Sequence, residues 1–430
     1  MKKNKFIVST IILIIGGFIT KILGMIIKII MTRLVGTEGI GLYMLVNPTF
    51  MLFIAICTLG LPTAISKLVS ENKRNNKKLI FSSLFLILII NIFIMLFIFI
   101  FAKFIANNLL HEERTYYSII AIGLVLPFIS ISGILRGYFF GKQRMFPHVL
   151  SNVLEDVTRL ISIVLFTPFF LLKGLEFAIF FLILSNIISE LTSIFVLLFF
   201  LPKNFKLYKK DITPSLSNIK DILEISLPTT GSRLIGTIGM FFEPIILTYF
   251  LIKSGFSNQY ILNEYGILNG YVMPLILLPS FFTGAISQAL LPIVSNGYSN
   301  KYYKYTKNKI KQAIFISLLI GIPATIIFVL IPEIPLKLIF NTNQGINYIK
   351  ILAPICLLHY IQSPLTVSLQ AMGKSNTAMI GTLIGMILRT IALIICCILK
   401  LGIYSLIIAS CINILYVTIH HILKVKNLFT

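Results

Sequence analysis

Apolar residues fill most of the chain in long segments that short polar gaps separate. A membrane-spanning α-helix needs about 20 mostly apolar residues, and each segment is close to that length or exceeds it. The pattern therefore predicts an all-α polytopic membrane protein with about twelve transmembrane helices. The predicted spans cover residues 6–31, 40–66, 79–103, 117–138, 147–172, 175–200, 221–251, 264–292, 312–332, 347–371, 377–399 and 401–423.

The composition supports a membrane protein. Hydrophobic residues make up 57% of the chain and charged residues 12%. An ordinary soluble domain could not bury this much apolar surface, so the bilayer must act as the solvent of the chain. The five cysteines lie inside predicted spans without the spacing of metal ligands. We expect them to be reduced packing residues, and we expect no metal site.

Lysines and arginines fall mainly into every second gap between the spans. Alternate gaps place twenty-four of them on one side and eight on the other. Because basic loops resist translocation, the richer side is predicted to be cytoplasmic, with both termini inside and the chain in the cytoplasmic membrane. The groups on that side are Lys2–Lys5, Lys67–Lys78, Arg136–Arg144, Lys203–Lys220, Lys301–Lys311, Lys374, and Lys424 with Lys426.

The net charge of +23 could suggest a nucleic-acid partner. Most of this charge adjoins the spans, however, where topology and the anionic lipids of the cytoplasmic face account for it. We therefore expect no nucleic-acid partner. The chain also has no Walker phosphate loop, HExxH motif or paired CxxC motif. The sequence thus predicts no ATP-driven pump, no cofactor and no catalytic residues.

Three features recur about 230 residues apart and indicate an internal duplication. Gly41, Tyr43 and Pro48 correspond to Gly270, Tyr271 and Pro274, Leu61-Pro62 to Leu291-Pro292, and Gly141-Lys142 to Gly373-Lys374. The predicted domains are a six-helix lobe at 1–200, a basic cytoplasmic connector at 201–220 and a six-helix lobe at 221–430. Because each lobe has an even number of spans, the lobes are parallel repeats, and transporters built this way place the substrate path between them.

Several predicted spans carry ionisable residues, each of which costs at least ~2.5 kcal/mol at a helix centre. One interpretation is structural pairing, above all between Glu155 and Arg159 one turn apart, with Lys28 extending to the membrane interface. The other is an anion-binding cavity, because several cations have no acid one turn away in the same span and the arginine fork suits phosphate oxygens. The cations are Lys21, Lys28, Arg159, Arg233 and Arg389, and the anions are Glu155, Asp156, Glu190 and Glu243.

Four of the prolines within predicted spans are candidate kink sites. They are Pro127, Pro274, Pro279 and Pro354. A proline removes a backbone hydrogen bond and allows a kink whose free groups neighbouring helices satisfy. These residues are either hinges for rocking helices or ordinary components of membrane helix packing.

Four segments of the chain resemble the stage V sporulation protein B group. They are TRLVGTEGIGLY at 32–43, LPTAISKLVSE at 61–71, RGYFFGKQRMFPHVLSNVLEDVTR at 136–159 and EYGILNGYVMPLILLPSFFTGAISQALLPIVS at 264–295. The group belongs to the oligosaccharide and lipid-linked-precursor flippases, which are related to the multidrug and toxin extrusion transporters. The resemblance implies two six-helix lobes in a V shape and export of a precursor for the spore cortex. It also implies a charged cavity that includes Lys21, Arg33, Glu155, Arg159, Arg233 and Glu243.

The sequence and the resemblance together predict a flippase that works by alternating access. Lys21, Arg233 and Arg389 would bind the head group of an undecaprenyl-linked glycan precursor, while its tail stays in lipid. The acids within the spans would hold these cations or bind a coupling Na⁺ or H⁺. One alternative is a cation-coupled multidrug exporter on the same scaffold, which the excess of buried cations disfavours. The other is an intramembrane glycan polymerase or ligase, for which the outer acids are few and unclustered.

Overall fold

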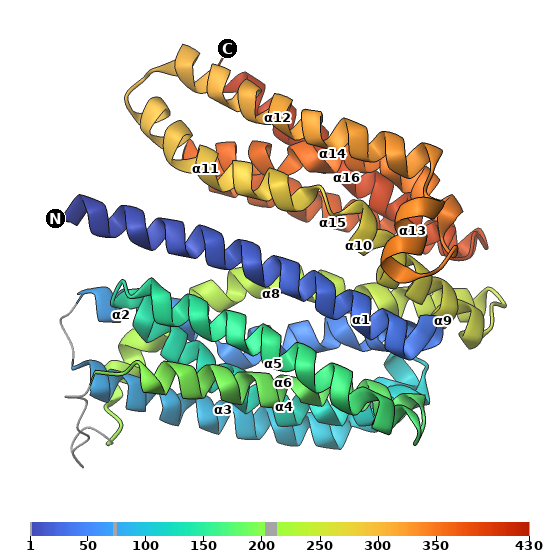
Figure 1. Ribbon diagram of the computed structural model, residues 1–430, viewed down its shortest axis with the longest axis horizontal. Helices are drawn as coiled ribbons and strands as arrows, with labels where there is room; N and C mark the ends of the chain where they lie inside the picture. Colours follow the sequence, from blue (N-terminus) through green and yellow to red (C-terminus); the bar gives the residue numbers. More distant parts are fainter. Residues whose placement is uncertain (1, 72–74, 203–212, 430) are drawn as a thin grey trace. The chain divides into compact units, whose positions relative to one another are not determined.

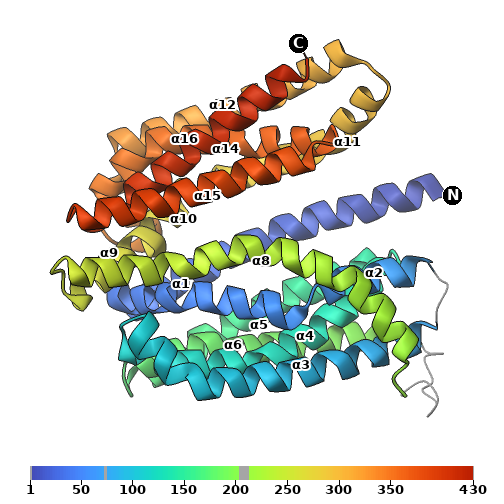
Figure 2. The same cartoon turned by 180° about the vertical axis from the view of Figure 1, so that it is seen from behind.

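The computed structural model describes residues 2–71, 75–202 and 213–429, and within these ranges the chain is helical with no β-strand (Figures 1 and 2). Contacts divide the chain into two compact units, residues 1–245 and 246–430. We call them the N-terminal and the C-terminal unit and describe each by itself. The division falls inside a helix, whereas the centre of the predicted connector at 201–220 lies outside the described residues, so that boundary stays a prediction.

The N-terminal unit consists of long helices that pack side by side (Figure 1). The helix α1 is interrupted at Gly36, whose φ of 69° is a left-handed conformation that glycine adopts readily. It therefore contains the first predicted span and most of the second. The helices are α1 (Lys2–Thr58), α2 (Leu61–Glu71), α3 (Asn76–Phe104), α4 (Tyr116–Gly141), α5 (Met145–Leu171), α6 (Leu175–Phe199) and most of α8 (Leu216–Lys253), with η1 (Ile105–Leu109) and η2 (Glu113–Thr115) between α3 and α4.

Glycines at intervals of four residues bring α4 close to α2. A Cβ atom added at Gly137 would lie 2.6 Å from the carbonyl oxygen of Pro62, and one added at Gly141 would lie 2.6 Å from that of Ser66. Small residues at this spacing let two helix backbones approach closely in a membrane protein. Buried apolar side chains, among them Ile65 and Phe139, surround this contact. This packing holds α4 against α2, and α4 carries the central residue of the site described below.

The C-terminal unit contains the remaining helices, and α15 lies beside α16 in it (Figure 2). Its core joins α11, α12, α14, α15 and the end of α16 through buried side chains such as Val294, Leu365 and Val425. The helices are α9 (Asn258–Gly266), α10 (Met273–Ile276), α11 (Ser280–Ser299), α12 (Tyr303–Leu330), α13 (Glu333–Phe340), α14 (Ile346–Ala371), α15 (Ser375–Ile398) and α16 (Tyr404–Asn427), and the π-helical segment η3 (Ile267–Val272) joins α9 to α10.

The eighth predicted span is a broken helix. The segments Asn258–Ile276 and Ser280–Ser299 meet at an angle of 52°, and the break follows Pro274 and includes Pro279. Here the hydroxyl of Tyr360 on α14 donates to the carbonyl oxygen of Ile276 at 2.5 Å. This bond satisfies a carbonyl at the broken end, as a membrane interior requires.

The other two prolines lie inside long helices, Pro127 in α4 and Pro354 in α14. Whether any of the four prolines acts as a hinge stays a prediction.

The all-α membrane fold is confirmed, and each predicted span falls on helical segments, of which the eighth span covers four, α9, η3, α10 and α11. Nine helices among the described residues are long and apolar enough to cross a membrane, or ten if the broken pair counts as one span. The number differs from twelve for two reasons. The long α1 counts once, and α5 is left out because Glu155, Asp156 and Arg159 interrupt its apolar sequence.

Candidate functional site

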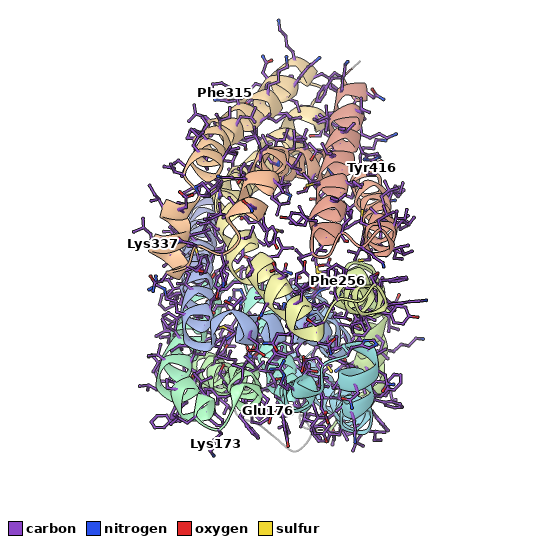
Figure 3. All side chains as sticks on the ribbon, turned by 90° about the vertical axis from the view of Figure 1, so that its right-hand side faces the viewer. Lys173, Glu176, Phe256, Phe315, Lys337 and Tyr416 are labelled. Atoms are coloured by element: carbon purple, nitrogen blue, oxygen red, sulfur yellow. The ribbon has the colours of Figure 1, made fainter. Side chains whose placement is uncertain are left out.

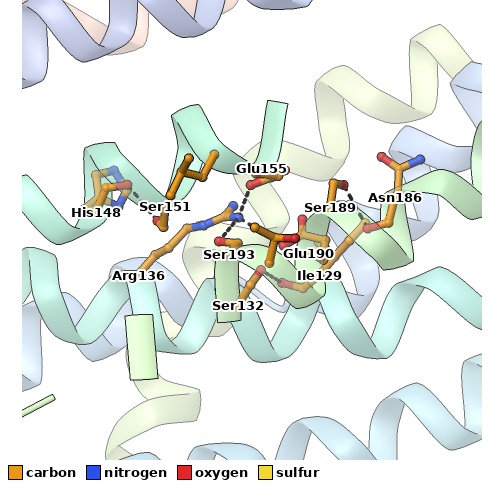
Figure 4. Close-up of polar contacts among 12 residues, drawn as sticks. Ile129, Ser132, Arg136, His148, Ser151, Glu155, Asn186, Ser189, Glu190 and Ser193 are labelled. Carbon is orange, nitrogen blue, oxygen red and sulfur yellow. Dashed lines mark hydrogen bonds and ion pairs between the residues drawn. The ribbon is translucent and has the colours of Figure 1, made fainter. Parts of the chain in front are cut away.

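A buried ionic network joins three helices of the N-terminal unit (Figure 4). The Arg136 guanidinium on α4 forms an ion pair with Glu155 on α5, and its Nη2 atom lies 3.0 Å from Glu190 Oε2 on α6. The same Nη2 atom donates to Ser193 Oγ at 2.8 Å. The side chains of Arg136 and Glu190 are only 21% and 6% exposed. One cation thus holds two carboxylates and a hydroxyl together inside the helix bundle.

The local sequence explains why these side chains meet. Glu190 and Ser193 lie three residues apart on α6, so both project from one face of the helix toward α4. Nearby serines return their hydroxyl hydrogens to their own helices, as Ser189 does to Asn186 and Ser151 to His148. Their small side chains leave room around the guanidinium. With both carboxylates ionised, the network carries more negative than positive charge, because one guanidinium faces two acids.

Arg136 is among the residues predicted to lie on the cytoplasmic side, and the structural interpretation pairs Glu155 with Arg159. That pairing is corrected, because Arg136 on α4 is the ion-pair partner of Glu155. The side of the membrane on which Arg136 lies stays a prediction. The signal that could have revealed the partner is the position of Arg136 itself, because it lies inside the predicted span at 117–138 and so belongs with the ionisable residues of the spans.

A cavity of about 240 Å³ lies beside this network, between α1 and α5. It brings together three of the predicted site residues, Lys28, Asp156 and Arg159. Tyr43 and Asn47 contribute a hydroxyl and an amide to its lining. The cavity adjoins the network because Asp156 directly follows Glu155 in the chain.

Two details of the cavity bear on its chemistry. The Arg159 Nε atom is buried and has no hydrogen-bond partner among the described residues. A buried donor left in this state costs about 1–3 kcal/mol, which a bound acceptor would recover. Near one end of the same helix pair, α1 and α5 approach so closely that a Cβ atom at Gly16 would lie 2.1 Å from Val149 Cγ1. The cavity wall is therefore set by direct helix packing.

The remaining predicted residues lie outside this cavity. The side chains of Lys21, Arg33 and Arg233 are exposed. Glu243 is half-buried on α8. In the C-terminal unit, Arg389 Nη2 donates to Ser410 Oγ at 3.4 Å, between α15 and α16. Their roles in substrate or ion binding stay predictions.

Three of the acids predicted for the outer face are engaged with other side chains. Arg114 holds Glu38 at 2.6 Å and Glu112 at 2.8 Å. Glu264 accepts a hydrogen bond from the hydroxyl of Tyr348. The described residues also contain no group of three or more His, Cys, Asp or Glu side chains that could hold a metal ion.

Comparison with known proteins agrees with this architecture. The family described as Polysaccharide biosynthesis protein matches residues 7–298, and the MatE family matches residues 244–395. Stage V sporulation protein B of Bacillus subtilis (strain 168) is 37% identical over 402 residues, which are 91% of this chain and 77% of that protein. Lipid II flippase MurJ of the same organism is 24% identical over 419 residues, which are 90% of this chain and 76% of that protein.

A solved structure shares the fold. An inward-facing multidrug resistance MATE family transporter of the MOP superfamily superposes with a TM-score of 0.78 at 18% identity, covering 95% of this chain and 94% of that one. The apolar helices, the buried charges and these relatives define a multi-pass membrane transporter of the flippase class. Within that class, the chain belongs to the polysaccharide biosynthesis protein family.

Proposed function

We propose that the protein moves an undecaprenyl-linked glycan or peptidoglycan precursor across the cytoplasmic membrane by alternating access, for spore cortex or cell-wall synthesis. Two relatives support the substrate class, since one is named for stage V of sporulation and another is named a lipid II flippase. The observation that carries the proposal is the cavity between α1 and α5, where Lys28 and Arg159 meet. No catalytic step is part of the proposal.

The cavity suits an anionic head group. Arg159 offers a planar fork of donors that matches phosphate oxygens, and Lys28 adds a second positive charge. Asp156 would hold Arg159 in place while the cavity is empty. Ligand pockets usually measure about 300–1,000 Å³. Because this cavity is smaller, we assign to it the pyrophosphate with at most the adjoining part of a sugar, rather than a complete muropeptide.

The Arg136 network supplies a basis for energy coupling. Two carboxylates share one guanidinium, and a surplus negative charge inside a membrane protein is costly unless a cation balances it. We propose that a proton or a sodium ion fills this role during the transport cycle. Glu155 and Asp156 are neighbours in α5, so a change of charge in the network would reach the cavity directly.

The proposed orientation follows the basic loops. Both termini and the lysine-rich loops face the cytoplasm of a cell whose plasma membrane contains anionic lipids. The head group would then enter from the cytoplasmic side and leave on the outer side, which is the direction of wall synthesis.

The test is flipping of a fluorescent undecaprenyl-pyrophosphate-linked muropeptide in proteoliposomes. We expect Lys28→Gln and Arg159→Gln each to lower the flipping rate at least ~tenfold, because each removes a charge-assisted contact with phosphate. Arg144→Gln and Lys173→Gln are the matched controls, since they remove exposed charges at the start of α5 and in the loop after it. Lys21→Gln and Arg233→Gln extend the series to predicted residues outside the cavity.

The outcomes separate the proposals clearly. Loss of flipping in the cavity variants, with the controls unchanged, supports head-group binding by the cavity. If the wild-type chain flips no lipid-linked substrate but exports an organic cation under an ion gradient, the flippase proposal is wrong and the drug exporter replaces it.

Coupling is tested in the same vesicles with the variant Glu190→Gln. We expect the wild type to respond to an imposed proton or sodium gradient, and only one of the two gradients to be effective. The variant removes the surplus carboxylate, so its flipping rate should no longer respond to that gradient. A variant that responds as the wild type does would exclude Glu190 from coupling.

A further inference from the structure

A second, larger pocket lies in the C-terminal unit, where α11 ends and α12 begins. Its volume is about 1190 Å³. Tyr302, at its rim, is 65% exposed. The polar side chains that line it include Lys301, Tyr302, Tyr303, Lys304, Tyr305 and Asn308.

The connection between the two helices is held in a specific conformation. The Tyr302 N–H donates to the Gly297 carbonyl at 2.8 Å, and Lys301 adopts a left-handed φ of 61°. A Cβ atom at Gly297 would lie 2.5 Å from Thr306 Oγ1, so the end of α11 packs tightly on the start of α12. The ring of Tyr298 packs on Tyr303 with centroids 5.5 Å apart. The pocket therefore rests on ordered packing.

The segment that forms the pocket carries charge of one sign only. Five lysines lie between residues 301 and 311, and the chain contains no Asp or Glu between Glu264 and Glu333. The first turn of α12 likewise has no acidic residue, and its N-terminus has no side-chain cap. Lys301 and Lys304 thus line the pocket without a carboxylate nearby in sequence. Such a pocket favours an anion with several oxygen acceptors.

The position of the pocket on α12 points to a lipid as the source of that anion. Beyond Lys311, α12 exposes apolar side chains, with Phe315 64% and Leu319 59% exposed (Figure 3). Phe315 is eleven residues beyond Lys304, about 16 Å along a helix. Tyrosine and lysine are typical of the membrane interface, where ring and charge lie at the level of the headgroups. At the interface, the pocket would lie beside the headgroups while the following turns contact acyl chains.

We propose that this pocket binds the phosphate-bearing headgroup of an anionic membrane lipid. Lys301 and Lys304 contact the phosphate, and the tyrosine hydroxyls with Asn308 bind the polar part of the headgroup. This site is distinct from the cavity between α1 and α5, and it does not depend on which substrate the transporter moves.

The chain contains no tryptophan, which provides a selective reporter. The variant Tyr302→Trp places the single tryptophan at the pocket rim. In a nonionic detergent, titration with dihexanoyl phosphatidylglycerol should change its fluorescence in a saturable way, whereas dihexanoyl phosphatidylcholine should have little effect. Adding Lys301→Gln and Lys304→Gln should weaken phosphatidylglycerol binding roughly tenfold or more, since each interfacial lysine contributes about 1 kcal/mol.

The matched control is the pair Lys307→Gln and Lys311→Gln in the same reporter. Both lysines are exposed on the same helix but do not line the pocket, so the net charge falls by the same amount. We expect this pair to weaken binding less than threefold, because neither lysine lines the pocket and both act on the bound headgroup only through the screened field. Native mass spectrometry of the wild-type chain gives a second measurement that needs no substitution at Tyr302.

Three results would overturn the inference. Equal weakening by the two lysine pairs would show diffuse attraction without a site. Equal response to phosphatidylcholine would remove the requirement for an anion. Displacement of the lipid by glycerol 1-phosphate at similar concentrations would make this a site for a soluble phosphate ester rather than for a membrane lipid.

Discussion

The two units of the molecule differ most clearly in where they keep carboxylates. Of the 14 acidic residues in the chain, all but Glu264 and Glu333 precede residue 246. In the N-terminal unit, buried polar contact is built from opposite charges, with Arg136 between Glu155 and Glu190. The C-terminal unit joins its helices largely through hydroxyl groups, and charged groups that take part contact a hydroxyl, as Arg389 does with Ser410 and Glu264 with Tyr348.

The hydroxyl contacts of the C-terminal unit illustrate the contrast. Tyr360 binds the Ile276 carbonyl, and Ser363 donates to Ser287 at 2.9 Å. Neither contact requires a counter-ion. A network with unequal numbers of positive and negative groups, in contrast, has a stability that depends on what else binds to it. If cation coupling depends on carboxylates, as we propose, this difference places the coupling residues in the N-terminal unit.

The largest expected effect comes from removing the one cation of the N-terminal network. Arg136→Met leaves Glu155 and Glu190 facing each other in a buried environment. Breaking a buried ion pair by removing one partner costs roughly 3–5 kcal/mol, and partial exposure of Arg136 places our expectation near the lower value. The free energy of unfolding, followed by helicity in mixed detergent micelles, measures this loss.

The charge explanation has its own control. In the triple variant Arg136→Met, Glu155→Gln, Glu190→Gln the surplus negative charge is gone, so we expect at least half of the lost stability to return. If the triple variant is as unstable as Arg136→Met alone, the effect comes from lost packing, and the contrast between the units is not one of charge.

A smaller effect is expected at the corresponding polar contact of the C-terminal unit. Tyr360→Phe keeps the ring and removes the hydroxyl that satisfies the Ile276 carbonyl at the helix break. Leaving a buried acceptor without a donor costs about 1–3 kcal/mol. The same unfolding measurement applies, with Tyr298→Phe as the control because the Tyr298 hydroxyl forms no hydrogen bond within the described residues. Equal stability of Tyr360→Phe and the wild type would show that water or the backbone satisfies the carbonyl.

Much of the fold could be predicted from sequence, because apolar length is a direct consequence of bilayer thickness. The helical segments followed from this pattern, and the break at Gly36 falls in the predicted gap between the spans 6–31 and 40–66. The break in the eighth span at Pro279 could not be predicted, because proline permits a kink without requiring one. Whether the helix breaks depends on a group that satisfies the freed backbone carbonyl, here the hydroxyl of Tyr360. The hydrophobic pattern along the chain does not predict which helices distant in sequence contact one another.

The candidate site shows the same limit. Glu155 on α5 and Glu190 on α6 were singled out from the sequence, but their common partner Arg136 was not. Spacing within one helix favoured Glu155 with Arg159, whereas the structure pairs Glu155 with Arg136 on another helix. Local spacing cannot rank a partner one turn away against a partner on a neighbouring helix, because helix packing decides which side chains meet.

The smallest expected effect tests whether charge makes a hydroxyl contact stronger. Ser193→Ala removes a bond to the Arg136 guanidinium, and hydrogen bonds to charged groups contribute about 1.5–3 kcal/mol. Ser363→Ala removes a neutral bond to Ser287, worth about 0.5–1.5 kcal/mol, and Ser287 keeps its own bond to Thr283. Unfolding of the two variants should therefore differ by about 1 kcal/mol, with Ser193→Ala the less stable. If the two losses are equal, Glu155 and Glu190 already saturate the guanidinium, and the contrast between the units lies in the carboxylates alone.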